Sequence, residues 1–116
     1  MFVTKSELDQ ILTAHKLWLE TDGKEGERAD LAAADLANVD LRGANLTGAN
    51  LANTNLANAN LRNAGLANAD LRSANLPISI RDCWSFRRAK FSADALPWLI
   101  LHPEWAEFKD TVQIAG

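Results

Sequence analysis

Leucine recurs at every fifth position from Leu31 to Leu76 without a break. A period of five matches neither the three-to-four spacing of a helix nor the two-residue alternation of a strand. On a helix these leucines would spread around the cylinder, and on one continuous strand they would alternate between opposite faces. The pattern therefore predicts an extended chain that turns a corner once in every repeat.

Each repeat also places a small or short side chain two residues before its leucine, with Asp or Asn between them except at Gly65. Residues two apart on an extended segment point to the same face. The other two positions hold small or turn-tolerant residues, including Asn and Gly, which adopt left-handed backbone conformations. The sequence predicts an all-β solenoid whose core is formed by one set of side chains: Leu31, Leu36, Leu41, Leu46, Leu51, Leu56, Leu61, Leu66, Leu71 and Leu76.

This tandem A-[D/N]-L-x-x pattern, clean over residues 29–78, resembles the pentapeptide repeat family. The resemblance implies a right-handed quadrilateral β-helix with four repeats per coil. Continuing the register by fives passes Arg81, which breaks the pattern, and then reaches Phe86 and Phe91. We therefore expect a β-helix of about 2.5 to 3 coils over residues 29–91.

A four-sided coil places residues twenty apart in one column, for example Asp30, Asn50 and Asp70. Paired carboxylates are a hallmark of acid–base chemistry. Because Asn fills the same position in other repeats, we interpret the position as a hydrogen-bonding partner of the backbone. Arg42 and Arg62 are also twenty apart, and form a candidate partner-binding spot for a carboxylate or phosphate; the alternative is a solvated face.

The segments outside the repeats are expected to cap the solenoid. Residues 1–28 predict a helix over 4–21 with a Thr4–Glu7 capping box, followed by a loop. Residues 92–116 predict a helical and irregular cap, with a helix from Ser92 to about 102, a helical turn through 108 and a strand at 112–114. The bulky apolar residues here either cover the last coil or form a dimer interface: Trp98, Leu101, Trp105 and Phe108.

No residue pattern predicts catalysis, a metal or a cofactor. Cys83 is the only cysteine, and it has no suitably spaced histidine, since His15 and His102 lie far away in the sequence. The net charge of −3 and the inward register of Trp84 and Phe86 argue against a nucleic-acid site. One cysteine, no signal-like N-terminus and no long apolar run predict a cytoplasmic, non-enzymatic protein without a membrane partner.

Two functions remain as expectations. The first is a protein–protein interaction module with an unidentified partner, able to form a homodimer through its C-terminal end. The second follows from the resemblance, because the best-known family activity is DNA mimicry directed at DNA gyrase; another topoisomerase or DNA-processing complex is a variant of it. Three coils span only about 15 Å, and residues 29–78 hold four Asp against three Arg. These features favour the interaction module.

Overall fold

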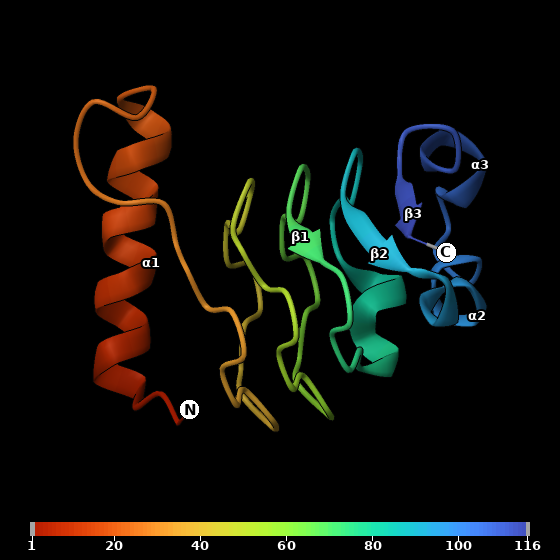
Figure 1. The fold of residues 1–116 in the computed structure, drawn as a ribbon, viewed down its shortest axis with the longest axis horizontal. Helices are drawn as coiled ribbons and strands as arrows, with labels where there is room; N and C mark the ends of the chain where they lie inside the picture. Colours follow the sequence, from red (N-terminus) through yellow and green to blue (C-terminus); the bar gives the residue numbers. More distant parts are fainter. Residues whose placement is uncertain (1, 116) are drawn as a thin grey trace.

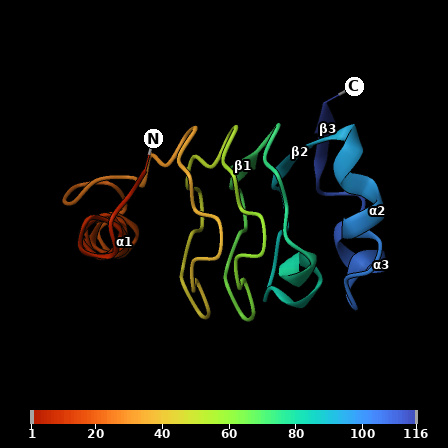
Figure 2. The ribbon, with the colours of Figure 1, turned by 90° about the horizontal axis from the view of Figure 1, so that it is seen from below.

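Stacked four-sided coils form the middle of the molecule, between a long helix at one end and short helical segments at the other (Figures 1 and 2). The computed structural model describes residues 2–115, with overall dimensions of 34 × 28 × 24 Å. In chain order the elements are α1 (Lys5–Glu20), β1 (Asp70–Leu71), the 3-10 helix η1 (Ile78–Asp82), β2 (Lys90–Ser92), the 3-10 helix η2 (Ala93–Ala95), α2 (Leu96–Leu99), α3 (Trp105–Phe108) and β3 (Gln113–Ala115).

Parallel backbone pairing joins residues that are twenty positions apart on all four sides of the coil. The bridges between the first and second coils are Asp30–Asn50, Asp35–Asn55, Asp40–Asn60 and Asn45–Gly65, and below them Phe2 pairs with Asp35. In the first, the Leu31 amide donates to the Asn50 carbonyl at 2.8 Å, and the Asn50 amide donates to the Ala29 carbonyl at 3.0 Å. On the same side β1, β2 and β3 form a parallel sheet in that order. The fold is therefore a β-helix with a twenty-residue coil.

The corners between sides are tight turns with one residue in the left-handed region. The amide of Ala34 donates to the carbonyl of Leu31 at 3.0 Å, and the next eight corners up to residue 74, together with the one ending at Ala89, repeat this bond. Only the second central residue of each turn has a positive φ, as a type II turn requires. Asn or Gly occupies most of these positions, but Ala33, Ser73 and Arg88 also have a φ of 61°.

The Asp or Asn before each leucine holds the corner through its side chain. Oδ1 of Asp30 accepts the amide of Ala32 at 3.1 Å, and seven further repeats make the equivalent bond. The side-chain amide of Asn50 also donates, through Nδ2, to Oδ1 of Asp30 in the coil below at 3.3 Å. Because an amide and a carboxylate both accept this bond, the position serves the backbone and not proton transfer.

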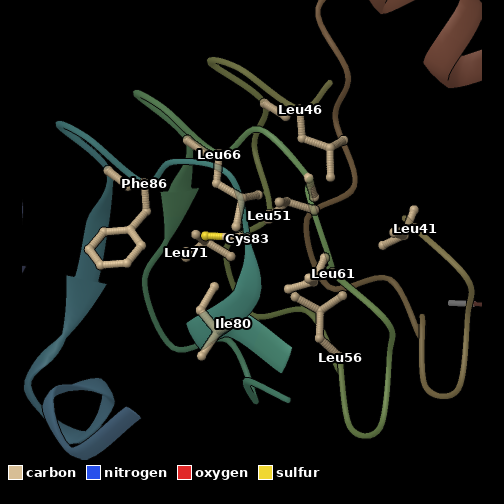
Figure 3. Close-up of a cluster of buried hydrophobic side chains, with 14 of the residues drawn as sticks. Leu41, Leu46, Leu51, Leu56, Leu61, Leu66, Leu71, Ile80, Cys83 and Phe86 are labelled. Carbon is tan, nitrogen blue, oxygen red and sulfur yellow. The ribbon is translucent and has the colours of Figure 1, made fainter. Parts of the chain in front are cut away.

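The leucines fill the interior of the coils, where their side chains converge (Figure 3). Nine of the ten, from Leu31 to Leu71, are at most 2 % exposed, whereas Leu76 is only partly buried. Phe86 and Phe91 are fully buried and extend this column past the repeats. Burying each of these side chains contributes about 1.5–3 kcal/mol before conformational entropy is subtracted.

The interruption at Arg81 is a 3-10 helix that replaces one side of the third coil. Ile80 of η1 turns into the core, and Arg81 points to solvent. The Ser79 hydroxyl donates to the carbonyl of Ala59 at 2.7 Å and accepts the amide of Leu61 at 3.0 Å. One side chain thus replaces the missing backbone pairing, and the twenty-residue pitch continues above it.

The inward register expected for Trp84 is wrong. Cys83 occupies the interior and Trp84 is 71 % exposed on the outer surface, because the chain leaves η1 one residue out of phase with the side-chain pattern. The Trp84 amide donates to the Ala64 carbonyl at 2.8 Å, a bond that the repeat register would assign to Ser85. Pairing with the coil below resumes at Gly65–Ser85.

The N-terminal helix forms as the sequence indicates. The Glu7 amide donates to Thr4 Oγ1 at 3.1 Å, and the Thr4 amide donates to the Glu7 carboxylate at 3.4 Å, which completes the capping box. Leu8 and His15 face the first coil and are buried. Gly26, with a φ of 70°, lets the following loop pass close to the backbone of Ala14.

The C-terminal segment is more broken than the expected helix from Ser92. It consists of η2 and the four-residue α2, with Pro97 in the first turn of α2. The Ser92 hydroxyl does not cap this helix; it accepts the amide of Ser73 in the coil below at 2.8 Å. The chain then forms α3 and returns as β3, where the Gln113 amide donates to the Ala89 carbonyl at 2.9 Å.

Candidate interaction surfaces

The aromatic side chains of the C-terminal segment divide into a buried and an exposed group. Phe86 meets the Phe108 ring edge to face at 5.0 Å between centroids, and the Trp105 ring lies 6.3 Å from it. Phe108 is buried and Trp105 is half-buried, so these two cover the last coil. Trp98 and Leu101 are 39 % and 50 % exposed, so they remain available for contact with another molecule.

Exposed bulky apolar side chains gather in the C-terminal third of the described chain. The exposed group around α2, which we call the α2 surface, consists of Leu96, Trp98, Ile100 and Leu101. Between residues 29 and 76, all of which the structure describes, no large hydrophobic side chain is exposed. The repeat faces are therefore polar. Phe2 and Leu17 are exposed in the N-terminal segment, but most of the exposed apolar side chains lie in the C-terminal third.

Both histidines are engaged by the backbone. His15 is fully buried; its Nδ1 accepts the amide of Ala29 at 3.0 Å and its Nε2 donates to the carbonyl of Thr47 at 2.8 Å. Burial lowers the pKa of His15 below 6.5. Within residues 2–115, no group of three or more His, Cys, Asp or Glu side chains is placed to hold a metal ion.

Cys83 is a buried, protonated thiol. Burial is the main cause that raises its pKa to about 12, and the nearby Asp82 carboxylate adds to the effect. The thiolate is the reactive form of cysteine. At neutral pH this side chain therefore acts as a small apolar core residue.

The candidate pair Arg42 and Arg62 has unequal partners. The Arg42 guanidinium donates two hydrogen bonds to Asp40, at 2.9 and 2.8 Å, and this contact lowers the pKa of Asp40. Arg62 follows Asn60 instead of an aspartate, and its Nε lies 4.0 Å from the Asp82 carboxylate. The two arginines are therefore in adjacent coils, but only Arg62 keeps its guanidinium free of hydrogen bonds in the described structure.

Arg72 repeats the arrangement of Arg42, although the twenty-residue spacing did not mark Arg72 as a candidate. Its guanidinium donates to both oxygens of Asp70, at 2.9 and 2.7 Å. The signal was present in the sequence, because both arginines stand two residues after an aspartate. An extended two-residue spacing places the two side chains on the same face.

A hollow of about 400 Å³ opens beside Trp84, between the corner after Leu61, the end of η1 and the start of the Pro103 turn. We call it the Trp84 pocket; its principal side chains are Arg62, Arg81, Asp82, Trp84, His102 and Glu104. The sequence signal for it is a set of departures from the repeat. Gly65 leaves the Asp/Asn position empty, and a Cβ there would lie 3.7 Å from the Trp84 ring.

A larger hollow of about 990 Å³ runs along the outer side of α1. Its charged residues alternate in sign and pair with one another, as in Lys5–Asp9 at 3.2 Å and Lys16–Glu20 at 3.8 Å. These exposed pairs leave little unmatched charge to select a ligand.

No helix within the described residues is long and apolar enough to cross a membrane.

Comparison with known proteins identifies the family of the repeat region. No curated protein sequence matches this chain. Among solved structures, the crystal structure of alr5209, a pentapeptide repeat protein from Nostoc PCC 7120, is 26 % identical and aligns over 89 % of this chain and 93 % of that one, with a TM-score of 0.29. The pentapeptide repeats family profile matches residues 27–63 and 40–76, with eight copies of the repeat. Residues 27–76 of this chain are therefore an array of pentapeptide repeats, the repeat that defines the pentapeptide repeat family.

Proposed function

We propose that this protein is a non-enzymatic protein–protein interaction module. In this proposal the repeats form a rigid, right-handed support, α1 and the C-terminal segment cap it, and the α2 surface makes the contact. The observation that carries the proposal is that residues 29–76 expose no large apolar side chain, whereas Leu96, Trp98, Ile100 and Leu101 lie close together around α2.

The α2 surface has the chemistry of an interface centre. Trp is enriched among the residues that dominate binding energy, and it contributes most when neighbouring groups exclude water. Trp98 borders a hollow of about 290 Å³ with Leu76 and Asp94, so its ring is accessible beside polar groups. We further propose that a second copy of the chain can occupy this surface, giving a homodimer through the C-terminal end.

Sedimentation of the purified protein, together with affinity capture from nuclease-treated lysate, tests the proposal. Trp98→Asp/Leu101→Asp should abolish self-association and lose the captured partner. The matched control is Asn38→Asp/Asn68→Asp, which adds the same charge at exposed corners where Asp tolerates a positive φ. Equal behaviour of both variants and the wild type, together with a monomeric wild type, would overturn the role of α2.

DNA mimicry gains no support from the charges on the repeat faces. The Arg42 and Arg72 guanidiniums neutralise Asp40 and Asp70, while the Asp30 column alternates with an amide. A mimic of duplex DNA needs closely spaced, uncompensated negative charge. We expect the purified protein to leave supercoiling by DNA gyrase unchanged, and dose-dependent inhibition would reverse this preference.

A further inference from the structure

We infer that the Trp84 pocket binds a carboxylate side chain flanked by an apolar residue on a partner protein. The inference rests on the proposed interaction function, but it concerns a different surface from α2. It is carried by two guanidinium groups that share the single Asp82 carboxylate without a hydrogen bond, an exposed indole and a balanced local charge. Each of these results from a departure from the repeat.

The departures meet where the second coil contacts the third. Gly65 of the second coil lacks the side chain that other repeats place in the Asp/Asn column, and η1 replaces one side of the third coil. The chain then turns Trp84 outward over the vacated position and Cys83 inward. Regular repeats fold without any of these changes. In the altered coil, Ser79 maintains the pairing and Cys83 fills the core. Local exceptions of this kind are expected at functional sites.

The arginines of the pocket differ from Arg42 and Arg72 on the repeat faces. Arg42 and Arg72 each donate two hydrogen bonds to an aspartate. In the part of the chain that the structure describes, the side chains of Arg62 and Arg81 make no hydrogen bond. Their Nε atoms lie 4.0 and 3.8 Å from the one carboxylate of Asp82, beyond hydrogen-bonding distance. Both guanidiniums therefore offer donors to an incoming carboxylate, whose two oxygens match their geometry.

The local charge disfavours a polyanion more strongly than a single negative charge. Two arginines and two acidic residues, Asp82 and Glu104, give the pocket a formal net charge of zero. A doubly charged phosphate or a nucleic-acid strand would meet both carboxylates without a surplus of positive charge. A carboxylate can bind the guanidiniums from the open side, and the rest of the ligand needs no charge.

Trp84 supplies the apolar part of the site. Its ring is 71 % exposed and forms one wall of a hollow of about 400 Å³, within the range of roughly 300–1,000 Å³ that binding pockets occupy. A partner that places an aromatic or aliphatic side chain on the indole would bury this area. The occupant is thus an acidic side chain next to an apolar one, such as the sequence Phe-Glu in an exposed loop.

Titration with short peptides tests the pocket in the full-length protein. The probe is Ac-Ala-Phe-Glu-Ala-NH2, and the readout is the NMR shift of the Trp84 indole N–H. The matched peptide has Gln in place of Glu, and a third has phosphoserine in its place. We expect the Glu peptide to bind at least tenfold more tightly than both others, because only it supplies a single carboxylate charge.

Protein variants separate the pocket from the rest of the surface. Arg62→Gln/Arg81→Gln should reduce affinity for the Glu peptide about tenfold or more, with a thermal unfolding curve close to that of the wild type. Arg42→Gln/Arg72→Gln removes the same charge from arginines that are already bound, and it should leave the affinity unchanged. Trp84→Ala should weaken binding and Trp84→Phe should largely restore it, with the peptide resonances as readout.

Several outcomes would overturn the assignment: equal binding of the Glu and Gln peptides, tighter binding of the phosphopeptide, equal losses in both arginine pairs, or no shift at about 10 mM peptide. The Trp98→Asp/Leu101→Asp variant keeps this test independent of the proposed function. It should bind the Glu peptide like the wild type even if the α2 surface has no partner.

Discussion

His15 and His102 make the same pair of backbone hydrogen bonds near opposite ends of the solenoid. In each ring Nδ1 accepts a backbone amide at 3.0 Å, from Ala29 or Glu104, and Nε2 donates at 2.8 Å to a carbonyl, of Thr47 or Cys83. An amide can only donate, so both rings carry their proton on Nε2. Each imidazole thereby connects a terminal segment to the nearest coil.

The His15 arrangement predicts a loss of stability on acidification. Burial lowers the pKa of His15 in the folded protein below 6.5, so the unfolded chain binds more protons as the pH falls below that value. The contribution of a neutral His15 is therefore complete above pH 6.5 and decreases below it. Urea unfolding at a series of pH values from about 8 to 5 should show this decrease. His15→Asn, which keeps an acceptor and does not titrate, should flatten the curve; an equally steep curve would exclude His15 as its source.

The left-handed corner at Ala33 predicts a stabilising substitution. An alanine with a φ of 61° costs about 1 kcal/mol relative to residues that adopt this region readily. Ala33→Asn should therefore raise the free energy of unfolding by up to about 1 kcal/mol. The neighbouring Ala32→Asn is the control, because Ala32 has no positive φ and should gain nothing. An equal effect at both positions would contradict the strain argument.

The difference in burial between Leu51 and Leu76 predicts unequal tolerance of charge. Leu51→Asp places a carboxylate among fully buried side chains without a partner, a cost of several kcal/mol that a small domain rarely withstands. We expect loss of the cooperative thermal transition measured by circular dichroism. Leu76→Asp should only lower the midpoint, because Leu76 is partly exposed. A wild-type melting curve for Leu51→Asp would be incompatible with the buried column.

The burial of Cys83 predicts an unreactive thiol in the native protein. A pKa of about 12 instead of 9.0 reduces the thiolate fraction about a thousandfold at pH 8. Reaction with Ellman's reagent should therefore be at least that much slower in buffer than in denaturant, where the ordinary pKa returns. Rapid modification of the folded protein, with an unchanged melting curve, would show that the thiol is accessible.

The periodic part of the fold was predictable from sequence because the repeat fixes both the backbone and its partners. The Asp30–Asn50–Asp70 column follows from a twenty-residue coil, and the capping box of α1 follows from Thr4 and Glu7 alone. In the first case every repeat carries the same hydrogen-bonding groups, and in the second the groups lie within one turn of helix.

The irregular part was not predictable, because side chains there exchange roles under tertiary constraints. Counting by fives assigns the interior to Arg81 and Trp84, but Ile80 and Cys83 occupy it. The backbone keeps its pitch across η1 because the Ser79 hydroxyl replaces the N–H and the C=O that a regular repeat would offer to the coil below. No local sequence pattern predicts this replacement. The Trp84 pocket depends on the same rearrangement. One feature of Arg62 was predictable: it lacks the hydrogen bonds to an aspartate that Arg42 and Arg72 make, because Asn60 stands at the position of that aspartate.

The twenty-residue ladder makes the separation of the two ends adjustable in fixed steps. Each coil bonds only to the coils above and below it, so inserting or deleting one coil would move α1 and α2 apart or together by one strand spacing, about 4.7–4.9 Å. The order of the four faces would stay the same. In a protein of this design, the distance between α1 and the α2 surface can evolve in steps of one coil without any change to either end.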